Sequence, residues 1–110
     1  MPYKIKSLPL FEKQSKRLIK KYPSLKRELL ALIELLKTNP EAGIAIGKNC
    51  FKIRISIASK GKGKSGGARV ITNIVFQNKI VFLISIYDKS EIGSLPQSEL
   101  DFLLNQIKLK

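Results

Sequence analysis

The chain has 110 residues, 44% of them hydrophobic, which is enough for one domain with one core. Its 21 lysines and arginines outnumber its 8 acidic residues, and the formal charge of +13 indicates a polyanionic partner: nucleic acid, an acidic membrane surface or an acidic protein. No histidine is present, which nearly excludes a metal site and imidazole acid–base catalysis, so we expect neither metal nor cofactor.

Cysteine content and hydropathy predict where the protein works. The single cysteine, Cys50, excludes an internal disulfide, and the first residues show no signal-peptide pattern. No apolar run approaches the roughly 20 residues that span a bilayer. We therefore expect a cytoplasmic protein without a membrane segment, folded as a single domain over residues 1–110.

The first 22 residues predict a short strand and a helix. Residues 3–6 are typical of a strand, and Ser7 is expected to cap a helix that has Pro9 in its first turn. The apolar face of this helix has helical spacing: Phe11, Ser15, Leu18, Ile19 and Tyr22. The other side carries Lys13, Lys16, Arg17, Lys20 and Lys21. Those cations form either a solvated face or a contact with nucleic acid or the ribosome.

A second helix is expected from Ser24 to Thr38, after the break at Pro23. Its core stripe consists of Leu25, Leu29, Leu32, Ile33 and Leu36. Two further leucines, Leu30 and Leu35, widen the stripe beyond what one face needs. We expect them in the core, and a protein partner that covers them is the alternative. The short turn between the helices predicts a helical hairpin.

The rest of the chain predicts a three-stranded meander and a final helix. Alternating residues indicate strands at 51–58, 68–76 and 79–87, with a turn at 77–78. A capping box of Ser94 and Gln97 is expected to start the last helix. Its apolar residues are Leu100, Leu103, Leu104 and Ile107. The predicted fold class is α+β: an N-terminal helical hairpin packed on a small, mainly antiparallel sheet with a C-terminal helix.

Strand alternation places basic residues on one face of this sheet. In the last strand, Ile80, Phe82, Ile84 and Ile86 are expected to face the helices. The opposite, open face would then carry Lys52, Arg54, Arg69, Tyr87 and Lys89. Such a face is either an ordinary basic sheet surface or an RNA- or DNA-binding surface, where cations contact phosphates and the tyrosine stacks on a base.

A glycine- and lysine-rich loop borders that face. Segment 60–71 (KGKGKSGGARVI) combines Lys60, Lys62 and Lys64 with four glycines that let the backbone approach a ligand. Its GKS tripeptide is not a P-loop, since the first glycine of that motif would fall at Ala58 and a strand, not a helix, follows.

Segment 63–71 (GKSGGARVI), together with segment 82–90 (FLISIYDKS), resembles the RelE/ParE toxin superfamily, and its HigB-like branch in particular. The resemblance covers nearly the whole chain. It implies the toxin of a type II toxin–antitoxin system, an endoribonuclease (mRNA interferase) that cuts mRNA in the ribosomal A site and so inhibits translation. In this chemistry the 2′-OH attacks the adjacent phosphate, which needs a base, a phosphate-binding cation and an acid.

The resemblance also implies roles for individual residues. Arg69 would bind the scissile phosphate, and Lys89 would be the acid or a second phosphate clamp. Lys62 and Lys64 are candidates for the general base. The remaining candidates would bind RNA: Lys52, Arg54, Lys60 and Tyr87. Many relatives have tyrosines after the Arg-Val-Ile sequence, where this chain has Thr72 and Asn73.

Partners and alternatives follow from the same resemblance. The toxin would act on mRNA and the ribosome, and would be held inactive by an acidic or amphipathic antitoxin with a DNA-binding region. ParE-like members of the superfamily inhibit DNA gyrase instead and cleave no RNA. A non-catalytic RNA- or ribosome-binding module is the third possibility. The rich set of cations favours the nuclease.

Overall fold

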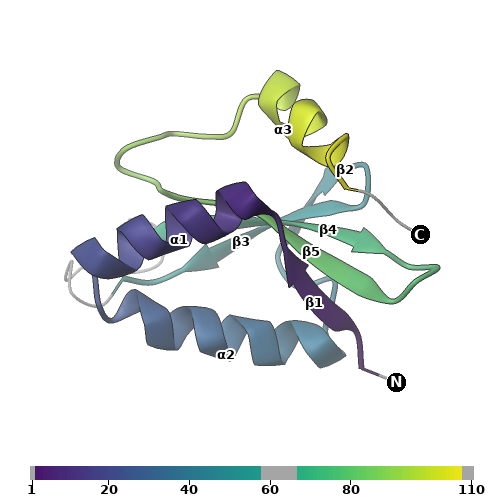
Figure 1. Cartoon of the computed structure of the whole chain (residues 1–110), viewed down its shortest axis with the longest axis horizontal. Helices are drawn as coiled ribbons and strands as arrows, with labels where there is room; N and C mark the ends of the chain where they lie inside the picture. The colour runs from purple at the N-terminus through teal and green to yellow at the C-terminus, as the bar shows by residue number, and fades with distance from the viewer. Residues whose placement is uncertain (1, 58–66, 108–110) are drawn as a thin grey trace.

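The computed structural model of the chain describes residues 2–57 and 67–107 (Figure 1). Their helices and strands follow one another along the chain as β1 (Lys4–Ser7), α1 (Pro9–Lys21), α2 (Leu25–Thr38), β2 (Ile44–Gly47), β3 (Cys50–Ile55), β4 (Ala68–Val75), β5 (Ile80–Asp88) and α3 (Gln97–Leu104). The α+β class and the positions of all three helices are confirmed.

The strands form one mixed sheet of five strands in the order β1-β5-β4-β3-β2. β1 lies parallel to β5, and the other neighbours are antiparallel. In Figure 1, α2 lies below the sheet and α3 above it. Helices α1 and α2 pack on one face of the sheet, mainly through Leu18 and four leucines of α2, and α3 packs on the other. The sheet therefore has two covered faces and two separate apolar clusters.

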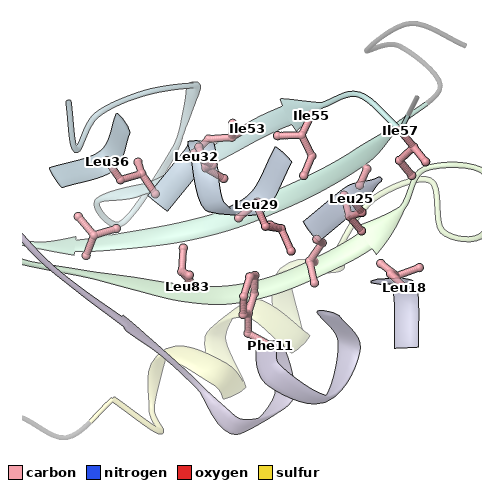
Figure 2. Close-up of a cluster of buried hydrophobic side chains, with 14 of the residues drawn as sticks. Phe11, Leu18, Leu25, Leu29, Leu32, Leu36, Ile53, Ile55, Ile57 and Leu83 are labelled. Carbon is pink, nitrogen blue, oxygen red and sulfur yellow. The ribbon is translucent and has the colours of Figure 1, made fainter. Parts of the chain in front are cut away.

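The larger cluster, called here the helix-side core, lies between the sheet and the α1–α2 pair (Figure 2). Figure 2 labels Phe11, Leu18, Leu25, Leu29, Leu32, Leu36, Ile53, Ile55, Ile57 and Leu83 within it. These side chains come from both helices, from β3 and β5, and from Ile57 just after β3, so the predicted packing of a helical pair on the sheet is correct in outline.

The two extra leucines of α2 do not belong to that core. Leu30 is 56% exposed and Leu35 is 47% exposed, whereas four α2 leucines are buried. The expectation that they widen the core is wrong, because four buried positions at helical spacing already cover the width that the sheet offers. The alternative, a partner that covers this side of α2, remains.

The predicted side-chain caps at the helix starts are also wrong. Ser7 ends β1, opposite Leu83, and its hydroxyl donates to the Glu12 carboxylate at 2.7 Å, while Leu8 occupies the N-cap position of α1. α3 begins after Pro96 without a side-chain cap: the side-chain amide of Gln97 donates to Asp101, and no capping box with Ser94 forms. In both cases the side chain expected in the cap forms a different hydrogen bond.

Strand β2 was not expected from the sequence. It forms a hairpin with β3 through Lys48 and Asn49, whose φ angles are +55° and +61°. Two consecutive residues with positive φ match the right-handed twist of a tight hairpin, a turn that usually contains glycine. The turn residues here are not glycine, and β2 has only four residues, so the pattern gives little signal.

A bulge in β5 changes which residues face the helices. Ile71 lies opposite Ser85 but Thr72 lies opposite Leu83, which leaves Ile84 as an extra residue. As a result Val81 joins the helix-side core. The side chains predicted to face the helices at Ile80, Phe82 and Ile84 instead form the second cluster with Leu100 and Leu103 of α3. Only the end of the predicted alternation is correct: Ile86 faces the helices and Tyr87 does not.

Gln14 of α1 satisfies the polar groups at this bulge. Its Oε1 accepts hydrogen bonds from the backbone N–H of Ile86 and from the hydroxyl of Ser85, both at 3.0 Å. A bulge disturbs the regular ladder, so a side chain that supplies an acceptor next to it stabilises the irregular strand.

Replacing Gln14 with alanine should therefore lower the free energy of unfolding by about 1–2 kcal/mol, since it removes the side-chain acceptor of both groups. Urea denaturation measures this, and Lys13→Ala, an exposed substitution on the same helix, is the matched control. Equal midpoints for the two variants would show that Gln14 does not stabilise the bulge.

Candidate functional site

Three predicted site residues form a row across the three middle strands, near one end of the sheet. Arg54 of β3 lies opposite Arg69 of β4, and Arg69 lies opposite Tyr87 of β5. Their neighbours Ile53, Ile55, Val70 and Ile86 all belong to the helix-side core. Because side chains alternate along strands, the row lies on the face opposite α1 and α2, as the sequence predicts.

This face is not open, however. Arg69 and Tyr87 are each only 3% exposed, whereas Arg54 is exposed. Residues 92–96 lead from the end of β5 to α3, which packs on this side of the sheet (Figure 1). The prediction of an open basic face is wrong, since no strand pattern shows that a later segment folds back over it.

The burial of Tyr87 has an electrostatic consequence. Loss of solvent raises the pKa of its phenol above the ordinary value of about 10, although a backbone hydrogen bond at Leu95 and the charge of Arg69 oppose the rise. Tyr87 is therefore a neutral phenol at physiological pH. It borders a small cavity of about 120 Å³ that Lys52, half-buried, also lines. The other lining residues are Ile46, Ile71, Ser94, Leu95, Gln97 and Leu100.

Arg69 is a buried cation that the backbone helps to hold. Its Nη1 donates to the carbonyl oxygen of Ala68 at 3.1 Å. A guanidinium keeps its charge even when buried, and a cation with little water around it acts more strongly on a nearby anion. Arg69 is thus suited to bind a phosphate that enters from the side of the exposed Arg54.

Lys89 follows β5 and is brought next to the start of β4. Its backbone N–H donates to the carbonyl oxygen of Gly67 at 3.1 Å, and its side chain is exposed. Gly67 lies against β3, because a Cβ atom built on it would come within 2.1 Å of the Ile55 carbonyl oxygen. The end of β3, the start of β4 and the residue after β5 therefore meet at one end of the sheet, two residues from Arg69.

Lys60, Lys62 and Lys64 lie outside the described residues. The described chain stops at Ile57, which is buried, and resumes at Gly67. Ile57 and Gly67 both adjoin the end of the sheet that carries Arg54 and Arg69.

Two carboxylates near this end were not singled out from the sequence. Asp88 is fully buried, and its Oδ1 accepts from the backbone N–H of Ser90 at 2.9 Å and from the Ser90 hydroxyl at 2.8 Å. This turn fixes the backbone on both sides of Lys89. The second carboxylate, Glu91, pairs with Arg17 and Lys21 of α1. Distance in sequence hides the pairing of Glu91 with α1, whereas the Asp88 turn is local, and an acid at the end of a strand is a signal for such a turn.

Within residues 2–57 and 67–107, no group of three or more cysteines, aspartates or glutamates is placed to hold a metal ion. In the same residues, none of the helices has the length and apolar character needed to cross a membrane.

Comparisons with known proteins identify the fold. No family model matches the chain. The free E. coli toxin RelE, carrying two arginine-to-alanine substitutions, superposes with a TM-score of 0.63 at 18% identity, covering 98% of this chain and 100% of that one. The isolated E. coli RelE toxin gives 0.52 at 16% identity, covering 96% and 99%. The substituted RelE in complex with an antitoxin RelBc peptide gives 0.52 at 19% identity, covering 100% and 99%. The chain therefore has a RelE-like fold over its whole described length.

Proposed function

We propose that this protein is the toxin of a type II toxin–antitoxin system, and that it is a ribosome-dependent endoribonuclease of the HigB-like kind. The observation that supports this most is the row of Arg54, Arg69 and Tyr87 on a RelE-like fold. The row lies at the end of the sheet where the lysine-rich segment joins the described chain. A net charge of +13 provides the attraction to RNA.

The proposed reaction needs no metal or cofactor. The ribose 2′-oxygen forms a bond to the adjacent phosphorus while the bond from phosphorus to the 5′-oxygen breaks, which leaves a cyclic phosphate and a free 5′-OH. A base takes the proton from the 2′-OH, and an acid gives a proton to the leaving 5′-oxygen. Charge builds up on the non-bridging oxygens between these two events, and a fixed cation stabilises it.

Arg69 is the cation that we assign to the phosphate, because its burial and its bond to Ala68 hold it in place. Lys89 is assigned as the acid or as a second phosphate clamp, since it is exposed beside the start of β4. Lys62 and Lys64 remain the candidates for the base. Crowding by other cations would lower the pKa of such a lysine and favour its neutral form.

Tyr87 is assigned to the RNA base next to the cut. A cavity of about 120 Å³ beside it holds little more than a few water molecules. Stacking of a base on Tyr87 therefore requires that residues 94–97 move away from the sheet. Arg54, which is already exposed, and Lys52 would make the first contacts with the RNA backbone.

The antitoxin is the second proposed partner, and one solved RelE structure contains an antitoxin peptide. A groove of about 580 Å³ runs between α2 and β3, and the exposed Leu35 and Ile44 line it. Lys52 and Arg54 of β3 line the same groove and outnumber its one carboxylate, Glu28, so an acidic, amphipathic segment fits its apolar residues and the basic residues of β3. Such a segment would cover Arg54 and block RNA. A second region of the antitoxin would bind DNA.

Primer extension on an mRNA in a reconstituted translation reaction tests the proposal. Cuts inside codons that appear only on translated message are expected. Cuts on naked RNA would keep the nuclease and remove the ribosome from its mechanism. No cuts by folded protein would contradict the nuclease and leave gyrase inhibition or plain RNA binding, for which the buried arginine is not needed.

A further inference from the structure

The last two turns of α1 form a basic surface that the proposed reaction does not use. Five exposed cations lie on this helix: Lys13, Lys16, Arg17, Lys20 and Lys21. Arg17 and Lys21 are four residues apart, so their side chains project from the same side of the helix. The sequence leaves open whether such a surface is merely solvated or contacts nucleic acid.

The structure adds an anion that is already bound there. The carboxylate of Glu91 lies between the two side chains: its Oε1 is 2.7 Å from Nη2 of Arg17, and its Oε2 is 3.3 Å from Nζ of Lys21. The second guanidinium nitrogen, Nη1, donates to Oε2 at 3.5 Å. The guanidinium thus holds both carboxylate oxygens, a geometry that also suits the two non-bridging oxygens of a phosphodiester.

Another anion can replace the Glu91 carboxylate in its contacts with Arg17 and Lys21. The side chain of Arg17 is 58% exposed, that of Lys21 is 51% exposed and that of Glu91 is 31% exposed. Exposed ion pairs contribute little stability, and salt screens them. The pKa of the Glu91 carboxyl is lowered, chiefly by its hydrogen bond from Arg17, so the carboxylate stays charged and competes with other anions at neutral pH.

The ion pair lies at the functional end of the molecule. Glu91 comes four residues after Tyr87 and two after Lys89, and its backbone N–H donates to the Asp88 carbonyl oxygen at 2.9 Å. In Figure 1 the C-terminal end of α1 and the ends of β3 and β5 lie at the same side of the molecule, on the left. An RNA strand that passes Arg69 and Lys89 can therefore continue around the end of the sheet onto α1.

We propose that Arg17 and Lys21 form a second binding site for an RNA backbone phosphate, and that Glu91 occupies this site until RNA displaces it. The inference rests on the proposed function in one respect, that the ligand is RNA. Glu91 then acts as an internal competitor that weakens RNA binding without touching the reacting atoms. The displaced carboxylate stays tethered beside the site, so the bound RNA phosphate adds one negative charge there, and removal of the Glu91 charge should favour RNA binding.

Fluorescence anisotropy with a labelled, unstructured RNA whose 2′-hydroxyls are methylated measures binding without cleavage. Glu91→Gln should bind this RNA several-fold more tightly than the wild type at low salt. Arg17→Gln/Lys21→Gln should bind more weakly, with a slope of log K against log salt that is smaller by roughly 0.7 for each lost phosphate contact to a single strand.

Two controls separate a local site from overall charge. Glu41→Gln removes an exposed acid in the loop after α2, and Lys4→Gln/Lys6→Gln removes two exposed cations of β1 at the far end of the molecule. Glu41→Gln should change RNA affinity much less than Glu91→Gln, and Lys4→Gln/Lys6→Gln much less than Arg17→Gln/Lys21→Gln. In the triple variant Glu91→Gln/Arg17→Gln/Lys21→Gln, the gain from Glu91→Gln should disappear, because the site that Glu91 competes for is gone.

The inference is overturned if Glu91→Gln and Glu41→Gln have the same effect, or if the gain persists in the triple variant. A thermal unfolding curve for each variant shows whether it is folded. We expect all of them to fold, because the substituted side chains are exposed. Primer extension distinguishes a failure of the proposed function from a failure of this inference. Cleavage by a wild type whose variants show no coupling overturns only the second site, and coupling without any cleavage overturns only the nuclease.

Discussion

Replacing Arg69 with glutamine is expected to reduce the rate of mRNA cleavage by about 100-fold or more, the usual cost of removing one preorganised group that stabilises transition-state charge. Arg69 is 3% exposed and its guanidinium donates to the Ala68 carbonyl oxygen, so the side chain is held in place before the substrate arrives. Glutamine is preferred to alanine, because alanine would leave a void and a buried carbonyl without this donor. Single-turnover cleavage of translated message is the measurement.

Arg54→Gln is the matched variant. Arg54 lies opposite Arg69 in the sheet but is exposed, so its loss should weaken RNA binding and change the rate at saturation much less. The thermal midpoint of each variant shows whether it is folded. If Arg69→Gln is folded and still cleaves at the wild-type rate, Arg69 does not bind the scissile phosphate.

Replacing Gly67 with alanine is expected to lower both stability and activity. The new Cβ would lie 2.1 Å from the Ile55 carbonyl oxygen and 3.1 Å from its carbonyl carbon, both backbone atoms that cannot rotate away. Strands β3 and β4 must move apart, and overpacking of this kind costs about 1–3 kcal/mol. Arg69 and Lys89 both adjoin this glycine, so a displacement of about 1 Å can cost roughly 100-fold in rate.

Gly93→Ala is the control for this prediction, since no atom lies within 4 Å of a Cβ built at Gly93. Urea denaturation and single-turnover cleavage are measured for both variants. Gly93→Ala should match the wild type in both assays. Wild-type stability of Gly67→Ala would show that the strands can separate at little cost and that the close contact at Ile55 does not define the site.

Local patterns predicted much of this fold because they report local physics. The leucine spacing of α2 identifies its buried face, and Leu25, Leu29, Leu32 and Leu36 are all buried. Alternation in β3 and β4 correctly places Arg54 and Arg69 together, away from the helices. Neither prediction requires knowledge of another segment, since each depends only on the period of a helix or a strand.

The errors arise where a second segment decides the outcome. The bulge at Ile84 reverses the first half of β5, and Gln14, about 70 residues earlier, supplies the acceptor for the adjacent Ile86 N–H. Leu30 and Leu35 have the composition of core residues, but the sheet leaves no room for them. One extra residue in a strand changes the face on which the preceding side chains lie, and one missing neighbour leaves an apolar side chain exposed. The period of a helix or strand contains neither piece of information.

The sequence by itself determined the charge, the absence of histidine, the two kinds of period and hence an α+β chain with cations gathered on one side of its strands. Only the tertiary structure decided that Arg69 and Tyr87 are buried and that Glu91 forms ion pairs with Arg17 and Lys21. The physical reason is that burial and ion pairing depend on distances between segments far apart in the chain. Those distances are set by how the segment after β5 turns at Asp88 and returns over the sheet.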